Sequence, residues 1–184
     1  MKVELKVNDK SVQAEIPEEQ LKELGAFEQL KKLGLIEEQR TGYERVKKGE
    51  MYYLIDTEYN SMLKITEFND QEDEQCYNTG NYYSNKTIAE NNARADRLLR
   101  QLRRWQAAND KSISEKDWND ESKKKWFVAY SYGAEKLYAD YYYIMRLPNT
   151  IHFATKEKAE EAIEVFRDEL IWYFVEYQQR LDEE

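Results

Sequence analysis

The chain has 184 residues, of which 35% are charged, and its 28 basic and 37 acidic side chains give a formal net charge of −9. A surface with this charge repels nucleic acids and anionic membranes at long range, so direct nucleic-acid binding is not expected. Cys76 is the single cysteine, which excludes an intramolecular disulfide. No apolar run approaches the roughly 18 residues that span a bilayer. We therefore expect a cytoplasmic protein, either one domain or two small halves that share a core.

Residues 1–40 are predicted to form a β-hairpin followed by a helix. Apolar and polar residues alternate over residues 2–7, and they alternate again up to Ile16. A period of two is typical of strands with one buried face. Pro17 then suits the first turn of a helix, because its fixed φ is helical and its missing N–H is not needed there. Leucines at helical spacing continue this helix to about Leu33.

Residues 41–108 are predicted to form a first β-sheet-plus-helix unit. An acidic loop is expected at residues 69–74, and a long helix is expected over about residues 86–107. The residues that can share the inner face of this helix are Ile88, Ala95, Leu99 and Leu102. The strand candidates of the unit are residues 43–46, 51–56, 62–68 and 82–83.

Residues 109–122 read as a polar linker, and residues 123–184 read as a second β-sheet-plus-helix unit. Its strand candidates are residues 125–132, 137–145 and 151–153. Thr155 is a candidate N-cap, because its hydroxyl can accept from free N–H groups of the first helical turn. The inner stripe of the following helix is expected to contain Ala159, Ile163, Phe166, Leu170 and Tyr173.

One short pattern occurs twice, about 70 residues apart, in residues 82–90 and 151–160. In each copy an aromatic residue ends an extended run, a small residue follows, and Lys-x-x-Ala-Glu opens a helix. The repetition indicates an internal duplication; the alternative is that a strand–turn–helix junction selects this order independently. The predicted fold class is α+β, with antiparallel β-sheet units each backed by a long helix, in one compact body.

No motif of the chain predicts catalysis, a metal or a cofactor. One cysteine and one histidine cannot build a structural zinc site. His152 stands between two apolar strand residues and is expected to be half exposed on the opposite sheet face. Cys76 follows the acidic stretch, where neighbouring carboxylates should raise a thiol pKa. Glycine-rich phosphate loops and serine-nucleophile motifs are absent. We therefore expect a protein that is not an enzyme.

An arginine-rich segment of the first long helix is one candidate contact surface. Arg97, Arg100 and Arg104 are spaced three and four apart, so they share one helix face, and Arg94 and Arg103 lie near them. Such a stripe can bind phosphates or an acidic partner. The favoured alternative is a solvated face, or one that pairs with the chain's own carboxylates.

The acidic C-terminal helix is the other candidate contact surface. Residues 154–184 contain ten acids and four bases. Glu157, Glu160, Glu161 and Glu164 lie near one another on the predicted outer side, where carboxylates can imitate a phosphate row. An ordinary solubilising face is the commoner role of such residues. The apolar run over residues 171–177 is expected to be enclosed, or to meet a partner or a second copy in a homodimer.

The chain contains, in this order, residues 80–86 with Ala89-Glu90, residues 117–120, residues 125–130, residues 151–153 with Ala159-Glu160, and residues 168–177. This order resembles a family of small accessory proteins of phages and prophages of Gram-positive bacteria. The resemblance covers roughly residues 43–178. It implies a context, a non-virion gene of a mobile element, and no catalytic residues. Small acidic proteins of that context are often inhibitors of host defence, such as anti-CRISPR or anti-restriction proteins.

We accordingly expect a non-enzymatic protein that binds and inhibits a host protein in the cytoplasm of an infected or lysogenic bacterium, without a cofactor, a metal or a membrane. The alternatives are a nucleotide second-messenger sponge, a nucleic-acid mimic, and a phage structural or assembly protein. The candidate partner-binding residues are Arg94, Arg97, Arg100, Arg104, Glu157, Glu160, Glu161 and Glu164.

Overall fold

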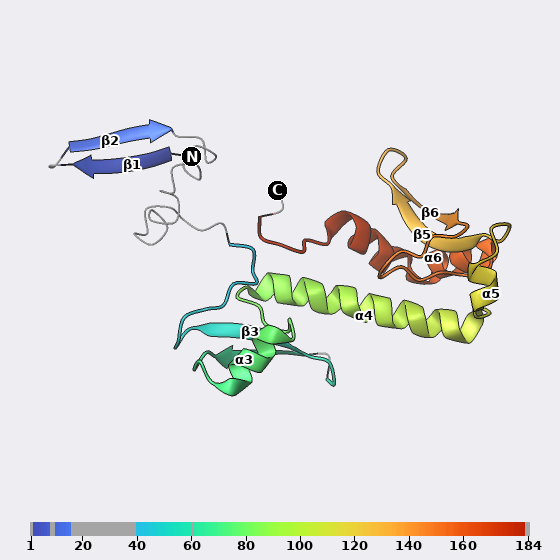
Figure 1. The fold of residues 1–184 in the computed structure, drawn as a ribbon, viewed down its shortest axis with the longest axis horizontal. Helices are drawn as coiled ribbons and strands as arrows, with labels where there is room; N and C mark the ends of the chain where they lie inside the picture. Colours follow the sequence, from blue (N-terminus) through green and yellow to red (C-terminus); the bar gives the residue numbers. More distant parts are fainter. Residues whose placement is uncertain (1, 8–9, 16–39, 60, 183–184) are drawn as a thin grey trace. The chain divides into compact units, whose positions relative to one another are not determined.

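A computed structural model of the chain describes residues 2–7, 10–15, 40–59 and 61–182, which are drawn in colour in Figure 1. The chain divides into two compact units, Met1–Thr41 and Gly42–Glu184. In the first unit, β1 (Lys2–Val7) and β2 (Lys10–Glu15) form an antiparallel hairpin in which Lys2 pairs with Glu15. The predicted hairpin is therefore confirmed, whereas the helix predicted after Pro17 lies outside the described residues.

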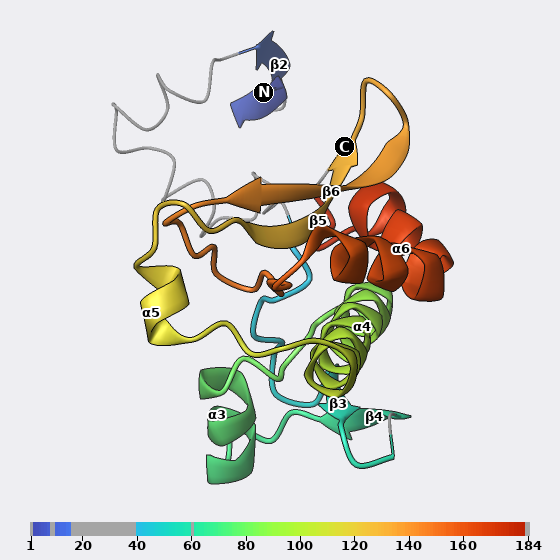
Figure 2. The ribbon, with the colours of Figure 1, turned by 90° about the vertical axis from the view of Figure 1, so that its right-hand side faces the viewer.

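The second unit is built around one long helix, α4 (Lys86–Asn109). The other elements are β3 (Met51–Asp56), β4 (Ser61–Thr66), α3 (Gln71–Asn78), α5 (Glu115–Trp118), β5 (Lys125–Ser131), β6 (Lys136–Tyr142), α6 (Lys156–Ile171) and a π-helix, η1 (Trp172–Glu176). Figure 2 shows α4 nearly end-on, with the β3–β4 hairpin on one side and α6 with the β5–β6 hairpin on the other. Both hairpins are antiparallel, and the predicted α+β class is confirmed.

The two copies of the repeated pattern form the same backbone contact. Tyr83 exchanges two hydrogen bonds with Tyr53 on β3, with N···O distances of 2.8 and 3.0 Å. Phe153 exchanges two with Trp126 on β5, with distances of 3.0 and 2.7 Å. In each copy the aromatic residue thus adds one bridge to the first strand of the preceding hairpin.

The helix that follows begins in the same way in both copies. Asn85 caps α4 by accepting from the Ile88 N–H, and Thr155 caps α6 by accepting from the Lys158 N–H. The Lys and Glu of the pattern form ion pairs of 3.0 Å in α4 and 2.9 Å in α6. The predicted strand–turn–helix geometry is therefore confirmed for both copies, which agrees with an internal repeat.

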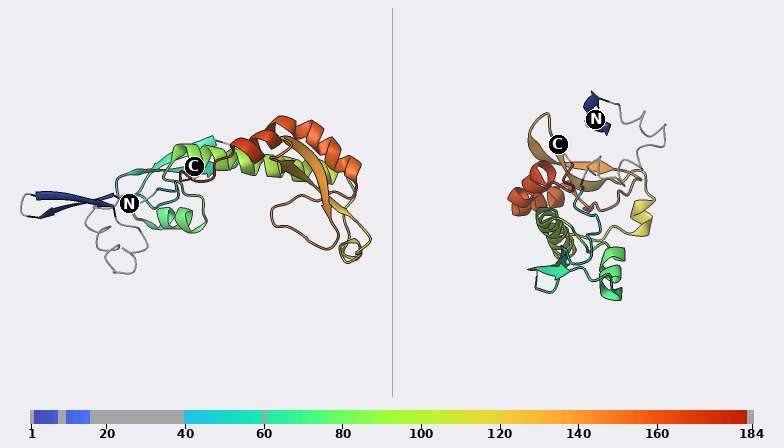
Figure 3. Two further views of the ribbon diagram at one scale, coloured as in Figure 1. Left: turned by 90° about the horizontal axis from the view of Figure 1, so that it is seen from above. Right: turned by 90° about the vertical axis from the view of Figure 1, so that its left-hand side faces the viewer.

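The core of the second unit consists of two clusters that share α4. Near the start of α4, Ile88 and Ala89 pack with Ile55 and Tyr83. Further along α4, Leu98 and Leu102 belong to the second buried cluster. Its other members are Phe153 and, on α6, Ala159, Ala162 and Leu170. Figure 3 shows α4 and α6 side by side. The β3–β4 hairpin packs against α4, whereas the β5–β6 hairpin packs chiefly against α6, because a two-stranded sheet cannot enclose a core of its own.

Two predictions for the first β-unit are wrong. Residues 43–46 form no strand. The expected acidic loop is instead the start of α3, because Asp70 and Asp73 form a reciprocal capping box at the helix N-terminus. The acidic residues of the first turn also suit the positive end of the helix dipole.

Two predictions about buried side chains need correction. On α4, Leu98 is buried, whereas Leu99 is only half buried. On α6, Leu170 is buried as predicted, but Phe166 and Tyr173 are half buried. Phe166 has a non-helical backbone, with φ −115° and ψ 19°, so α6 is kinked there and its inner stripe shifts.

Candidate functional site

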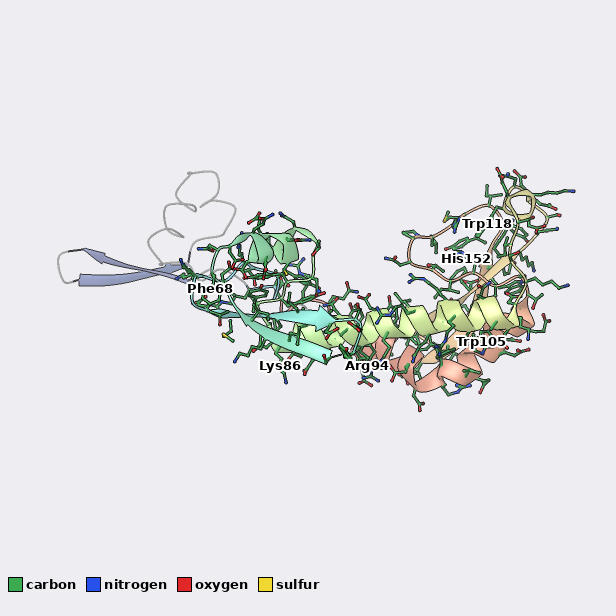
Figure 4. All side chains as sticks on the ribbon, turned by 90° about the horizontal axis from the view of Figure 1, so that it is seen from below. Phe68, Lys86, Arg94, Trp105, Trp118 and His152 are labelled. Atoms are coloured by element: carbon green, nitrogen blue, oxygen red, sulfur yellow. The ribbon has the colours of Figure 1, made fainter. Side chains whose placement is uncertain are left out.

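Arg94 holds two helices together within the fold. Its guanidinium donates two hydrogen bonds to the Glu169 carboxylate, at 2.9 and 3.0 Å, and lies 4.0 Å from the Trp172 ring centroid. The hydrogen bonds from Arg94 lower the pKa of Glu169 below its usual range. Arg94 therefore links α4 to α6 and η1, and Figure 4 shows it near the middle of α4.

The other arginines of α4 face outward. Arg100, Arg103 and Arg104 are exposed, and Arg97 is half buried near enough to Glu169 to lower its pKa slightly by its charge. Among the described residues, none of these four forms an ion pair within 4.0 Å. We call Arg97, Arg100, Arg103 and Arg104 the arginine face. It is a positive surface in a chain of net charge −9.

The acidic face of α6 is largely neutralised by its own helix. Glu160 pairs with Lys156, Glu161 pairs with Lys158 at 2.6 Å, and Glu164 pairs with Arg167. The first-turn residue Glu157 has a lowered pKa because its carboxylate accepts backbone and Thr155 hydrogen bonds. These four glutamates line a shallow groove against β6 of about 550 Å³, which none of the α4 arginines lines.

The first β-unit contains a buried network of tyrosine hydroxyls and carboxylates, which are residue types that also occur in catalytic sites. The Tyr52 hydroxyl donates to Asp73 at 2.8 Å, and the Tyr82 hydroxyl donates to Glu67 at 2.6 Å. Arg45 pairs with Glu67 at 3.1 Å, and both carboxylates also accept backbone N–H groups of residues 68–70. Because its members satisfy one another, this network is suited to fixing the loop between β4 and α3.

An apolar cavity of about 440 Å³ lies in the second unit. Its walls come from α4, β5, the loop at residues 147–151, and the junction of α6 with η1. Leu99, Tyr130, Tyr132, Pro148 and Phe174 are among the lining residues. Its size and its mostly apolar lining with a few hydroxyl groups are those of ligand-binding pockets.

The backbone around this cavity is irregular at two places. Tyr173 and Phe174 lie in the π-helix η1, a rare conformation that is frequently found at functional sites. The Phe174 carbonyl accepts a hydrogen bond from the Tyr132 hydroxyl. Asn149, in the opposite wall, has a positive φ of 56°, which is uncommon for a residue other than glycine. Departures of this kind gather at binding sites.

Exposed apolar side chains occur in and next to the segments that line the cavity. The lining residue Tyr132 is 71% exposed, and Ile144 and Met145, which precede the lining loop in the sequence, are 64% and 51% exposed. Arg103 lies one helical turn after the lining residue Leu99, so the arginine face begins beside the cavity. An apolar hollow with a positive margin suits an apolar side chain flanked by carboxylates.

His152 lies on the sheet face opposite this cavity, and its predicted half-exposure is wrong. It is only 8% exposed, because Trp118 and Phe127 pack against its ring at centroid distances of 5.0 and 6.0 Å. Figure 4 shows His152 and Trp118 close together. The Nε2 atom has no hydrogen-bond partner, and burial lowers the pKa of the imidazole.

The cavity was not predicted from the sequence. Its signal was present in α4, where Leu98, Leu99 and Leu102 make an apolar stripe wider than contact with α6 alone requires. Within the described residues, no group of three or more His, Cys, Asp or Glu side chains could hold a metal ion. No helix among those residues is long and apolar enough to cross a membrane.

No protein-family model matches the chain, and neither the curated proteins nor the solved structures contain a match.

Proposed function

We propose that this chain is a non-enzymatic binding protein, a phage or prophage accessory protein that inhibits a host protein by occupying its surface. The proposal rests on one observation above the others: an apolar cavity of about 440 Å³, lined in part by the exposed Tyr132, lies beside an arginine face that forms no ion pair with the described residues. The resemblance to phage accessory proteins supplies the context.

The partner segment that fits this site has an apolar side chain next to carboxylates. The apolar side chain enters the cavity beside Leu99 and Tyr132, where aromatic and aliphatic walls desolvate it. The carboxylates meet Arg100 and Arg103, whose guanidinium groups have no carboxylate of the described residues within 4.0 Å. The apolar anchor supplies affinity, and the charges orient the encounter and reject partners of the wrong sign.

The structure gives the rival functions less support. A nucleic-acid mimic needs an unpaired acidic band, whereas Glu160, Glu161 and Glu164 are each paired within α6. A nucleotide sponge built on arginines and tyrosines needs both in one pocket, whereas the apolar cavity is lined by Tyr130, Tyr132 and Tyr173 but by no arginine.

The test combines capture with a measurement on purified components. The tagged protein is expressed in a Gram-positive host, the recovered partner is identified, and its affinity is then measured with both proteins purified. Leu99→Trp, which fills the cavity, and Tyr132→Ala, which removes its exposed rim, should each weaken binding at least about tenfold.

Leu63→Trp is the matched control, because Leu63 is exposed on β4 and does not line the cavity. It should leave the affinity unchanged. Equal affinity of the wild type and Leu99→Trp would place the contact elsewhere and refute the proposal.

A further inference from the structure

A second cavity, of about 480 Å³, lies at the N-terminal end of α6 and has a basic lining. Four lysines and one aspartate contribute to it: Lys111, Lys123, Lys124, Lys125 and Asp117. Its remaining walls include Ile113, Trp126 and Ala154. It shares no residue with the apolar cavity, so it is an independent site.

The lysines of this cavity are not cancelled by carboxylates. Within the described part of the chain, only Lys123 of these four forms an ion pair, with Asp117, which lowers the pKa of that carboxyl group. Lys111 is exposed and has no ion pair among the described residues, and Lys124 lies over the Tyr141 and Trp126 rings, at 4.1 and 5.4 Å from their centroids. Two ammonium groups are therefore available to an anion.

Lys125 adds a fixed positive charge beneath them. It is 1% exposed, and its ammonium donates to the main-chain carbonyls of Asp120 and Tyr143. A lysine is almost never buried so completely without a paired carboxylate, and within the described residues it forms no such pair. An ammonium group that lies among carbonyl dipoles and 5.9 Å from the Trp118 ring centroid adds to the local positive potential.

The neighbouring aspartates Asp110 and Asp120 are already engaged by donors of the protein itself. Asp110 accepts from the Ala154 N–H at 2.7 Å and from the Lys111 N–H at 2.7 Å, and Asp120 accepts from Ser122. Neither lines the cavity. Ala154 directly precedes the N-cap of the 16-residue helix α6, whose dipole adds positive potential on this side.

We propose that this cavity binds a small phosphate-bearing ligand with a flat apolar part, a mononucleotide. The phosphates meet Lys111 and Lys124, and the flat part lies against the apolar wall formed by Ile113 and Trp126. A cavity of this size exceeds what one phosphate needs and falls in the range of small-molecule sites. The net charge of −9 disfavours a long polyanion by repulsion from the rest of the surface.

The experiment is isothermal titration calorimetry of the full chain with ATP, pyrophosphate, adenosine and a single-stranded oligonucleotide as separate probes. We expect ATP to bind with one site per chain, pyrophosphate to bind more weakly and compete, and adenosine not to bind. Binding should weaken with added salt, because exposed lysine–phosphate pairs are screened.

No binding of ATP or pyrophosphate would overturn the proposal. Equal affinity for both would overturn its apolar part, and a preference for the oligonucleotide would overturn the choice of a mononucleotide.

The double variant Lys111→Gln/Lys124→Gln should bind ATP at least about tenfold more weakly, because two charged contacts are lost. Lys47→Gln/Lys48→Gln is the matched control, since both lysines are exposed, form no ion pair among the described residues and give the same change in net charge. An equal loss in the two double variants would show a general charge effect and overturn the site. Circular dichroism of both variants establishes that they are folded.

Discussion

Gly42 is the residue at which packing and backbone conformation together allow no side chain. Its φ is +98°, and a Cβ atom placed there would lie 2.8 Å from Cγ1 of Ile88, which is fully buried. The Gly42 carbonyl also accepts a hydrogen bond of 2.8 Å from the Ser84 N–H. Gly42 therefore allows the start of the second unit to pack closely against the first turns of α4.

Gly42→Ala should lower the free energy of unfolding by about 2–4 kcal/mol, since backbone strain and the clash with Ile88 add together. Gly80→Ala is the control, because Gly80 also has a positive φ, +76°, but no atom within 4 Å of a built Cβ. It should cost only the strain, about 1–2 kcal/mol. Chemical denaturation measures both changes, and equal losses would show that Ile88 moves aside freely.

His152 should make stability depend on pH. Burial lowers its pKa below the usual value of 6.5, Arg146 lowers it further by repulsion, and the Thr150 backbone opposes both. The unfolded chain therefore binds a proton more readily, so stability falls as the pH drops below about 6.5 and the loss levels off below the folded-state pKa.

The matched variant is His152→Phe, which keeps an aromatic ring beside Trp118 and Phe127. Denaturation at pH 7.5 and pH 5 should show that the wild type loses more stability than this variant over the interval. Identical pH dependence of the two proteins would contradict the lowered pKa.

At the scale of the elements, the fold depends on how α4 is shared. Its first turns pack under the β3–β4 hairpin, and its later turns pack against α6 and beneath the bridge at Phe153. Arg94 lies between these two regions and fastens α6 and η1 through Glu169 and Trp172. This contact fixes α6 and η1 against α4, the same helix on which the β3–β4 hairpin packs.

Arg94→Ala should destabilise the protein by about 1–2 kcal/mol, because it removes a forked ion pair and a cation–π contact that are partly exposed to solvent. Arg94→Lys should recover only part of this loss, since an ammonium cannot make the two parallel hydrogen bonds. Arg100→Ala, an exposed change on the same helix, should stay within about 0.5 kcal/mol. Thermal and urea denaturation distinguish these outcomes, and equal effects of Arg94→Ala and Arg100→Ala would remove Arg94 from the fold's main contacts.

At the scale of the whole second unit, the two charged helices have different roles. The arginine face is without ion pairs among the described residues, whereas the acidic face of α6 is paired within its own helix. The two surfaces also differ in surroundings, since only the arginine face lies beside the apolar cavity. This separation lets stability and partner binding be tested independently.

Reversing the exposed residues Arg100, Arg103 and Arg104 to Glu should abolish partner binding with little change in the melting temperature. Reversing Glu157, Glu160, Glu161 and Glu164 to Lys should instead cost about 1–2 kcal/mol, because three helical ion pairs become repulsive pairs, and should leave partner binding largely intact. Melting curves and affinity measurements on both variants check this. Loss of binding in the acidic variant alone would reassign the contact to α6.

Several features of the second unit could be predicted from local sequence. The strand candidate at residues 51–56 matches the bounds of β3, and the repeated Lys-x-x-Ala-Glu pattern marked the start of α4 and α6. Thr155 was predicted as an N-cap because its hydroxyl needs only the next turn of its own helix. Such features depend on residues within about one turn of each other, which is why the sequence alone determines them.

Other features were decided only by the tertiary structure. Whether Leu98 or Leu99 is buried depends on where α6 crosses α4. Whether Arg94 is a surface residue or an internal one depends on its ion pair with Glu169, which lies 75 positions away in the sequence. His152 is buried because Trp118 packs over it from a segment that reads as linker. The apolar cavity is likewise assembled from four segments distant in the chain. The sequence determined the α+β class and the repeated helix starts, because these follow from local periodicity and capping. The candidate sites required the three-dimensional structure, because burial, pairing and cavities arise from contacts between residues that local patterns do not relate.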